Sequence, residues 1–354
     1  MTFSIGVVGA TGQVGREFLR IVEEGDRPDL PIGSLRLFAS ERSAGKRLNV
    51  RGQEHVIELA RPDPRLFEGL DFVLSAIGDE HAKIFSPAIA KAGAVNVDKS
   101  NAWRMDPSVP LVVPEVNPHA AREHRGIIAG PNCSTTQMVV ALWPIHRVNP
   151  IERIIADTYQ AVSGTGWRAV DELNEQLGNA AASRPVEHQV YPHRILGNVI
   201  PEIGGLKNDG LYSEERKMID ETRKIFSAPD LRISATCVRV PVAIGHAEAV
   251  HVELEREMSA QEAREILRTA EGVEVIDDPR SSSYPMPLHV AGKDPVYVGR
   301  IRNDPSHPRG LALWIVGDNL RKGAALNAIQ VFELVAREGW YAKNAPATRQ
   351  EVHA

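Results

Sequence analysis

The first 130 residues alternate short apolar runs with stretches whose apolar residues recur at helical spacing. Phe3 to Val8 is an apolar run of strand length, and apolar residues from Val14 to Val22 then recur three or four positions apart. The alternation continues with strand-like runs at 34–39, 71–76 and 95–97 and a helical stretch at 80–92. Strands that alternate with helices predict a parallel, doubly wound α/β sheet.

Beyond residue 132 the pattern changes to longer strands with fewer helices between them. Ile151 to Gln160 predicts a long strand and Ser213 to Phe226 a helix. Ser234 to Pro241 and Ala247 to Glu255 alternate apolar and polar residues, and we expect them to pair as a hairpin. Further elements are a helix capped by Ser259 and Glu262 and ending at Thr269, strands at 296–302 and 311–316, and a closing helix at 322–338. Residues 178–212, rich in Pro, Gly and Asn, predict loops or an interface arm, which gives a second domain of α+β type.

Composition narrows the class of protein. The 354 residues suggest two domains, and the net charge of −5 argues against a general affinity for nucleic acid. Two cysteines cannot build a disulfide framework or a thiolate metal site, so no metal is expected. No apolar run approaches the roughly 18 residues of a membrane span, and the N-terminus opens directly into a strand pattern. We therefore expect a cytoplasmic protein without a membrane partner.

The turn after the first strand carries three glycines in the spacing G-x-x-G-x-x-G, from Gly9 to Gly15. Glycines let a backbone approach a phosphate closely, and the N-terminus of the following helix favours an anion. In a dinucleotide fold the end of the second strand meets the adenosine ribose. Ser40, Arg42 and Ser43 surround Glu41 there and suit a 2′-phosphate, so we predict NADP; the alternative is a solvated polar loop.

Cys133 follows a strand-like run and the turn Gly130-Pro131-Asn132, and a helical stretch follows it. Unpaired N–H groups and the helix dipole favour an anion at a helix N-terminus, so we expect this thiol to ionise more easily than a free cysteine, whose pKa is about 8.5. A buried cysteine acting as a small hydrophobe is the alternative. The polar Asn, Ser and Thr neighbours favour a nucleophile.

Two cations and a histidine lie where they could serve such a nucleophile. Arg239 lies on a strand face, where a lone arginine needs an anionic partner, and His246 lies at the tip of the expected hairpin. Arg104 lies in a loop beyond the fourth strand, on the side where ligands of doubly wound sheets bind. A solvated loop arginine and a satisfied turn histidine are the alternatives.

Seven stretches in order resemble the aspartate-β-semialdehyde dehydrogenase family over nearly the whole chain. They are Gly9-Ala10-Thr11-Gly12-Gln13-Val14-Gly15, Asn101-Ala102-Trp103-Arg104-Met105-Asp106, Val112-Val113-Pro114-Glu115-Val116-Asn117, Pro131-Asn132-Cys133, Tyr159-Gln160-Ala161-Val162-Ser163-Gly164-Thr165-Gly166, Cys237-Val238-Arg239-Val240-Pro241 with Gly245-His246, and Gly317-Asp318-Asn319-Leu320-Arg321-Lys322-Gly323-Ala324.

The resemblance implies reductive dephosphorylation of L-aspartyl 4-phosphate to L-aspartate 4-semialdehyde with NADPH, through a cysteine thioester. This step belongs to the biosynthesis of lysine and diaminopimelate, threonine and methionine. The resemblance also implies a homodimer or homotetramer. Its Rossmann-like, NADP-binding domain would comprise residues 1–132, completed by the C-terminal helix 320–354, and an α+β catalytic and dimerisation domain would comprise residues 133–319.

The family's motifs assign roles to residues of this chain. Cys133 is the acyl-forming nucleophile, His246 the acid/base and Gln160 the residue that orients the acyl intermediate. The substrate site comprises Arg239 for the carboxylate, Arg104, Lys217 and Asn132 for the phosphate, and Glu214. The NADP site comprises Gly9, Thr11, Gly12, Gln13, Val14, Ala39, Ser40, Arg42, Ser43, Ser163, Gly164 and Asn319. A histidine with an ordinary pKa near about 6.5 could assist thiol ionisation and then protonate an alkoxide.

Some residues depart from the family's pattern. Lys99 stands where the family more often has Asn, Ala247 follows Gly-His where Ser is common, and residues 186–200 match only loosely. Lys99 could add a contact to phosphate, or the replacement could be without effect on function. The rival enzyme is an N-acetyl-glutamyl-phosphate reductase, whose family usually reads Pro-Gly-Cys-Tyr around its nucleophile. A non-catalytic NADP-sensing protein of the same fold is the alternative from another class, and it would be expected to lose Cys133 or His246.

Overall fold

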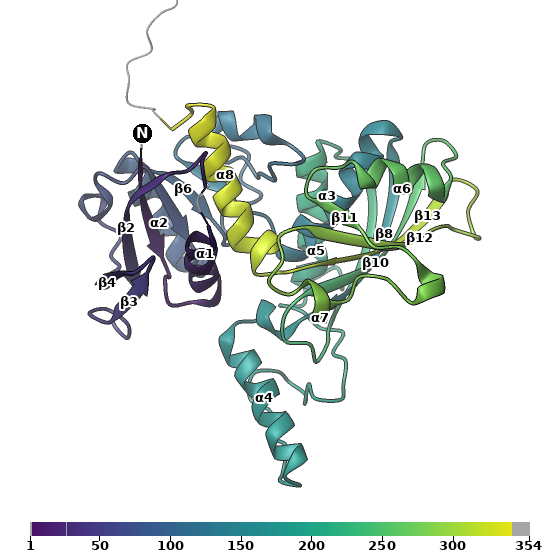
Figure 1. Cartoon of the computed structure of the whole chain (residues 1–354), viewed down its shortest axis with the longest axis horizontal. Coiled ribbons are helices and arrows are strands. Elements are labelled where there is room, and N and C mark those ends of the chain that lie inside the picture. Colours follow the sequence, from purple (N-terminus) through teal and green to yellow (C-terminus); the bar gives the residue numbers. More distant parts are fainter. Residues whose placement is uncertain (1, 26, 342–354) are drawn as a thin grey trace, which may run out of the picture.

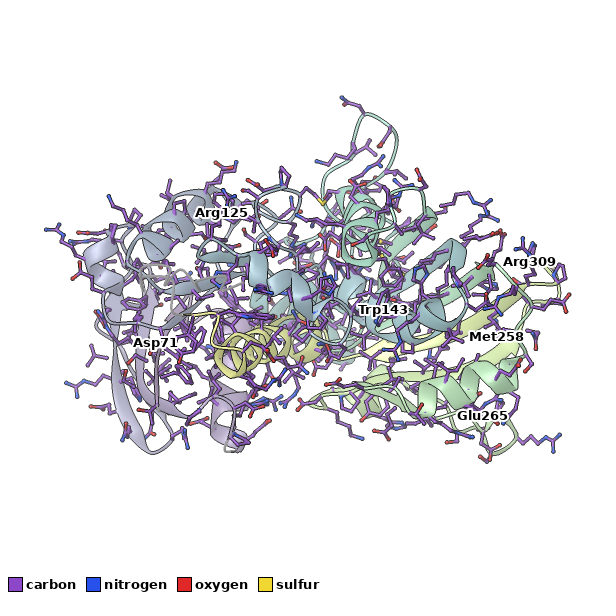
Figure 2. The ribbon with its side chains drawn as sticks, turned by 90° about the horizontal axis from the view of Figure 1, so that it is seen from above. Asp71, Arg125, Trp143, Met258, Glu265 and Arg309 are labelled. Carbon is purple, nitrogen blue, oxygen red and sulfur yellow. The ribbon has the colours of Figure 1, made fainter. Side chains whose placement is uncertain are left out.

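The structure is a computed structural model that describes residues 2–25 and 27–341. Two sheets form two adjoining bodies, with helix α8 (Leu326–Arg337) between them and helix α4 (Trp167–Ala181) projecting away from both (Figure 1). A view turned by 90° keeps Asp71 in the first body and Met258, Glu265 and Arg309 in the far part of the second (Figure 2). The α/β organisation in two parts is therefore confirmed.

The first sheet has seven strands in the order β3-β4-β2-β1-β5-β6-β7. The strands are β1 (Phe3–Val8), β2 (Ile32–Ala39), β3 (Arg47–Val50), β4 (Gln53–Leu59), β5 (Phe72–Ser75), β6 (Val95–Asp98) and β7 (Ile127–Ala129). All pair in parallel except β3 with β4. Strands β2, β4 and β3 lie on one side of β1, and β5, β6 and β7 lie on the other. The turn after β1 therefore lies at the switch point of the strand order, where such sheets bind ligands. The predicted parallel sheet is confirmed.

Helices cover both faces of this sheet because its strands are apolar on both sides. Helix α1 (Gln13–Glu24) and α8 share one core, in which the rings of Phe72 and Phe332 lie 5.0 Å apart. Helix α2 (Asp79–Lys91) and the 3₁₀ turn η1 (Pro64–Phe67) bury Phe85 and Phe67 on the other face. Fully burying one such side chain stabilises the fold by about 1.5–3 kcal/mol. Helix α8 therefore packs on the first sheet although it lies near the end of the chain.

The second sheet has six strands in the order β11-β12-β13-β10-β8-β9. They are β8 (Ile151–Gln160), β9 (Arg232–Arg239), β10 (His246–Leu254), β11 (Val273–Val275), β12 (Val296–Asn303) and β13 (Gly310–Gly317). One face packs against α3 (Cys133–Val148), α5 (Ser213–Phe226) and α6 (Ala260–Arg268), as expected for strands whose inward positions are apolar. Val250, Val252 and Leu254 are buried in this core, and Ser259 caps α6 with the predicted Glu262 partner. The core of the second body thus lies directly under the helix that begins with Cys133.

The predicted hairpin of the 234–241 and 247–255 segments is wrong. Strand β8 lies between them: β9 pairs with β8 in parallel, and β10 pairs with β8 on the other side in antiparallel. The predicted strand boundaries are close to those of β9 and β10. A connection of only six residues does not require the two strands to be neighbours in the sheet. Arg239 and His246 still reach the same end of the sheet because β9 ends where β10 begins.

Other differences concern elements that the pattern did not predict. The β3–β4 pair extends the first sheet, and α4 occupies residues that the sequence left partly as loop. The remaining short elements are η2 (Pro118–Glu123), η3 (Val162–Gly164), η4 (Pro279–Ser281) and α7 (Pro287–Val290). The closing segment begins as a π-helical turn, η5 (Arg321–Ala325), before α8. The predicted C-terminal helix 320–354 extends into residues 342–354, which lie outside the described residues.

Within residues 2–25 and 27–341, the helices are too short or too polar to cross a bilayer.

Candidate active site

Cys133 is the first residue of α3, and the turn before it is fixed by hydrogen bonds on both sides. Asn132 caps the helix: its Oδ1 accepts from the backbone N–H groups of Ser134 (3.0 Å) and Thr135 (3.1 Å). Its own backbone N–H donates to Glu221 (2.7 Å), and its Nδ2 donates to Glu214 (2.7 Å). The predicted position of Cys133 at a helix N-terminus is confirmed, and α5 clamps this terminus in place.

His246 lies against the sulfur of Cys133. The distance from Sγ to His246 Nε2 is 3.3 Å, and the backbone N–H of Ala161 lies 3.0 Å from Nδ1. Because that N–H donates to Nδ1, the neutral imidazole carries its proton on Nε2, facing the sulfur. The imidazole is therefore oriented to donate a hydrogen bond to a thiolate or to an oxyanion formed on the acyl carbon.

The expectation of an easily ionised thiol is wrong for the free protein. Burial, with the negative charge of Glu214, raises the pKa of Cys133 to about 11, against the opposing effect of Arg239, Lys99 and Arg104. Burial and the charge of Arg239 lower the pKa of His246 to about 3. The pair at neutral pH is a thiol beside a neutral imidazole.

The sulfur lies in a cavity of about 480 Å³ formed where the two bodies meet. Gln160, Arg239 and Lys217 line it from β8, β9 and α5. Arg239 is 4% exposed; its Nη1 donates to Ala161 O (2.7 Å), and its Nε has no partner in the described structure. A Cβ atom on Gly164 would lie 2.9 Å from Arg239 Nη1 and 3.2 Å from His246 Nε2, so the glycine leaves room at the point where these groups converge.

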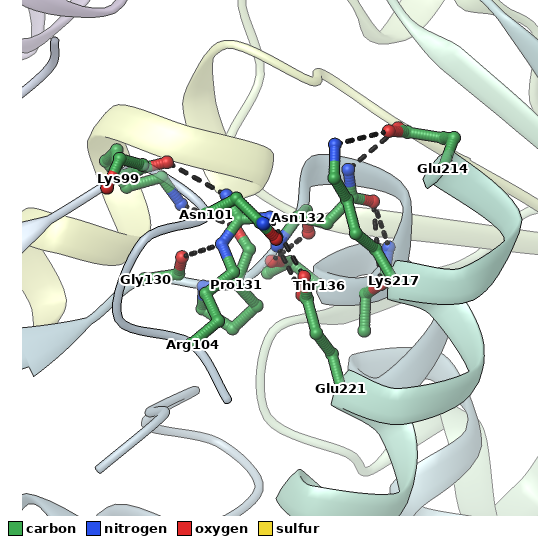
Figure 3. Close-up of polar contacts among 12 residues, drawn as sticks. Lys99, Asn101, Arg104, Gly130, Pro131, Asn132, Thr136, Glu214, Lys217 and Glu221 are labelled. Carbon is green, nitrogen blue, oxygen red and sulfur yellow. Dashed lines mark hydrogen bonds and ion pairs between the residues drawn. The ribbon is translucent and has the colours of Figure 1, made fainter. Parts of the chain in front are cut away.

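Charged side chains gather on the α5 side of this cavity (Figure 3). Arg104 forms a buried ion pair with Glu221 (2.9 Å) and also donates to Gly130 O and Lys99 O. Lys217 pairs with Glu214 at 3.1 Å. Burial would raise the pKa of Glu214, but Lys217 and the hydrogen bond from Asn132 hold it below its ordinary value. Glu214 is therefore ionised, and it is paired with Lys217 at the wall of the cavity.

The glycine turn after β1 has the geometry that a phosphate cradle needs. Gly9 has φ +87°, and a Cβ atom there would lie 2.4 Å from Ala76 O. A Cβ atom on Gly15 would lie 2.4 Å from Gly9 O, while the N–H of Gly12 donates to Gly9 O (2.9 Å). Only glycine fits at these two crowded positions. The residues present therefore fit a dinucleotide cofactor.

A second cavity of about 620 Å³ extends from this turn, and Leu320 lines both cavities. Four predicted cofactor residues line it: Thr11, Gln13, Arg42 and Ser43. The predicted residues Val14, Ser163, Gly164 and Asn319 line the cavity of Cys133 instead, as expected for the reactive end of an extended cofactor. Ala39 is buried at the end of β2, and Ser40 is exposed beside it, with its backbone O accepting from Ser43 N and Ala44 N.

Sequence reasoning missed several residues at both cavities. Arg16, Lys46, Arg47 and Trp167 line the larger one, and Gly323 lines the one that holds Cys133. Lys99, for which the sequence left a phosphate contact open, also lines the cavity of Cys133. Lys46 and Arg47 follow Ser43 closely in the sequence, and this cluster of positive charge is a signal for an anion site at the larger cavity. Glu221 was not recognisable, because a glutamate one helical turn beyond Lys217 carries no pattern of its own.

Within the described residues, no three side chains of His, Cys, Asp or Glu come together to hold a metal ion.

Comparisons with known proteins agree with this geometry. The family model "Semialdehyde dehydrogenase, NAD binding domain" matches residues 4–124, and "Semialdehyde dehydrogenase, dimerisation domain" matches residues 142–322. An aspartate-semialdehyde dehydrogenase of Aquifex aeolicus is 47% identical over 342 residues, covering 96% of this chain and 99% of its own.

Two solved structures are similar as a whole. The aspartate semialdehyde dehydrogenase II of Vibrio cholerae, solved in complex with ASA, has a TM-score of 0.90 at 41% identity and covers 96% of this chain and 99% of its own. The enzyme of Candida albicans, solved with NADP, has a TM-score of 0.75 at 25% identity and covers 96% of this chain and all of its own. The chain belongs to the aspartate-semialdehyde dehydrogenase family. It is an oxidoreductase with a domain for a nicotinamide dinucleotide.

Proposed function

We propose that the chain reduces L-aspartyl 4-phosphate to L-aspartate 4-semialdehyde through a thioester on Cys133. The observation that carries this proposal is the Cys133–His246 contact of 3.3 Å in a cavity lined with both cationic and cofactor-domain residues. The names of the relatives support the substrate, and biosynthesis of the aspartate-family amino acids is the role that follows from it.

The reaction divides between residues that position the substrate and residues that react. Cys133 Sγ attacks the acyl carbon, an S–C bond forms, and phosphate departs with the electrons of the C–O bond and takes up the proton that the thiol gives up. Gln160 orients the acyl group, and Arg239 holds the carboxylate with a planar guanidinium. Nε2–H of His246 stabilises the oxyanion and protonates it later.

The phosphate subsite and the cofactor complete the proposal. Arg104, Lys217 and Asn132 receive the departing phosphate, and Glu214 accepts from the substrate ammonium. NADPH, when bound, would supply the hydride that reduces the thioester. The S–C bond then breaks, the hydroxyl proton passes to the departing sulfur, and the semialdehyde leaves with Cys133 restored as the thiol. Residues of the glycine turn and of the 40–43 loop hold the cofactor.

An assay with two acyl phosphates tests the substrate. The chain should reduce aspartyl phosphate and leave N-acetyl-glutamyl phosphate essentially untouched. A preference for the second substrate would establish the rival reductase, and no turnover of either would favour the NADP-sensing alternative. The comparisons name aspartate-semialdehyde dehydrogenases and lend no support to these alternatives.

The choice of NADP over NAD rests on the positive charge of the larger cavity. Arg16, Arg42, Lys46 and Arg47 line it together with Ser43, and the Candida albicans relative was solved with NADP. We expect Arg42→Ala to raise KM for NADP several-fold, on the order of 1 kcal/mol for an exposed cation, and to leave KM for NAD nearly unchanged. Steady-state kinetics with both cofactors measure this, with the exposed Arg65→Ala as control. Equal use of both cofactors by the wild type would refute the preference.

The family model supports a homo-oligomer, and we propose a homodimer or homotetramer. Trp167 and Leu177 on α4 and Val199 and Leu206 in the loops that follow are exposed and apolar, which suits a subunit contact. We further propose domain boundaries at 1–132 with 320–354 and at 133–319, supported by the packing of α8 on the first sheet. A cytoplasmic location stays a prediction.

A further inference from the structure

Lys99 follows β6 and lies partly buried at the cavity that holds Cys133. Its Nζ donates to Pro131 O at 2.8 Å and to Gly323 O at 3.2 Å. The first carbonyl belongs to the turn that carries the nucleophile, and the second to the closing segment. Both neighbours adjoin Cys133: Pro131 precedes it by two residues, and a Cβ atom on Gly323 would lie 2.8 Å from Cys133 Cβ. The amino group is therefore anchored on two sides of the nucleophile.

The surroundings leave room for this side chain, but Glu221, the carboxylate whose charge acts on it, forms no ion pair with it in the part of the chain that the structure describes. A Cβ atom on Gly130 would lie 2.6 Å from Lys99 Cδ and 2.9 Å from Nζ, so the glycine makes space for the lysine. Within the described residues, no carboxylate forms an ion pair with Nζ. Taking an unpaired ammonium out of water is costly, and the two carbonyls need only two of its three N–H groups. An amino group held at a cavity without an ion-pair partner is a candidate for a functional role.

Of the charged groups around the nucleophile, Arg239, Lys99 and Arg104 favour the thiolate and Glu214 opposes it. His246 carries its proton on Nε2 and has its Nδ1 occupied by the Ala161 N–H, so the imidazole does not supply a positive charge. A thiolate at Cys133 therefore depends on these three cations, and Lys99 is the one anchored on the turn that carries the sulfur.

We propose that Lys99 is the electrostatic partner of the nucleophile: its ammonium, anchored between Pro131 O and Gly323 O, stabilises the Cys133 thiolate. The inference rests on the proposed role of Cys133. Because the free base also donates two N–H groups, both protonation states of Lys99 keep the two carbonyl contacts. Burial, with the positive charge of Arg104, lowers the pKa of Lys99 to about 7, so the group carries its charge reversibly at neutral pH.

Other charges face the same two groups and set the background for the test. Around Cys133 they are Glu214, Arg239, Arg104 and His246; around Lys99 they are Arg104, Glu221 and Lys322. All of these stay in place when only Lys99 is changed, so a difference between variants reports the charge of Lys99.

The test measures the rate of Cys133 alkylation by iodoacetamide against pH in the full-length protein, with mass spectrometry of the modified peptide. It needs no substrate, so its outcome is independent of the proposed reaction. Cys237 is fully buried and does not compete. Removing a cation close to a thiolate raises the pKa of the thiol, typically by 1 unit or more. We expect Lys99→Met and Lys99→Gln to lose roughly tenfold in alkylation rate below about pH 7, where Lys99 is charged, and this loss to shrink at higher pH, where Lys99 is neutral.

Lys224→Met is the matched control. Lys224 also donates to backbone carbonyls, those of Arg104, Asp106 and Val109, but does not line the cavity of Cys133. Its loss should leave the alkylation rate below pH 7 within about twofold of the wild type, whereas Lys99→Arg should keep most of the wild-type rate. Lys99→Gln keeps an N–H donor for the two carbonyls and is the alternative if Lys99→Met does not fold. A cooperative thermal transition shows folding, and one folded uncharged variant is enough for the test. An alkylation rate below pH 7 that is unchanged in Lys99→Met or Lys99→Gln would overturn the proposal, and so would an equal loss of rate in Lys224→Met.

Discussion

Cys133→Ala is expected to lower kcat by about 10⁴-fold or more while dissociation of NADP changes less than about twofold. The variant removes the S–C bond on which the proposed reaction depends. The glycine turn and the cationic cavity that would hold the cofactor belong to another part of the chain and do not change. Stopped-flow or steady-state turnover measures the first effect, and fluorescence titration of NADPH measures the second.

Cys237→Ala is the control for this variant. Cys237 is 0% exposed and packs against Met218 in the second core, so its loss should lower stability slightly and keep kcat within about tenfold of the wild type. Turnover of Cys133→Ala within tenfold of the wild type would exclude a covalent intermediate on this residue.

Arg239→Lys is expected to lower kcat/KM for aspartate semialdehyde by about ten- to a hundredfold. The guanidinium already donates to Ala161 O with Nη1, and its unpartnered Nε leaves an edge for a carboxylate. Lysine keeps the charge but cannot hold a carboxylate with two parallel hydrogen bonds. Loss of a hydrogen bond between charged groups corresponds to roughly 1.5–3 kcal/mol.

The comparison with His246→Asn separates recognition from chemistry. His246→Asn should lower kcat with a smaller effect on KM for the semialdehyde, because the imidazole faces the sulfur rather than the carboxylate clamp. Both variants are measured with semialdehyde and phosphate varied separately. If Arg239→Lys weakened phosphate and spared the semialdehyde, Arg239 would belong to the phosphate subsite.

The sequence predicted most of the elements because their local patterns are strong. The helix Ser213–Phe226 and the strand Ile151–Gln160 have the predicted boundaries. The order of strands in the second sheet could not be predicted in the same way. The placement of β8 between β9 and β10 depends on contacts between residues some 80 to 100 positions apart, and short-range alternation carries no information on such pairing.

The sequence predicted which residues form the candidate site, but not the protonation states of its thiol and imidazole. Cys133, His246, Gln160 and Arg239 come together in one cavity as the motifs indicated. Their protonation depends on burial, which raises the pKa of the thiol and lowers that of the imidazole. A helix N-terminus is visible in a sequence, whereas the depth of the cavity and the placement of Glu214 beside it are not.

The most direct test of the account is the reverse reaction, in which aspartate semialdehyde and inorganic phosphate are supplied with NADP. The account predicts NADPH formation that requires both the semialdehyde and phosphate, with saturation by each, and that Cys133→Ala abolishes. Formation of NADPH from semialdehyde at the same rate without phosphate would contradict the phosphorylating reaction. No NADPH with both substrates present, from folded protein that binds NADP, would contradict the proposed function as a whole.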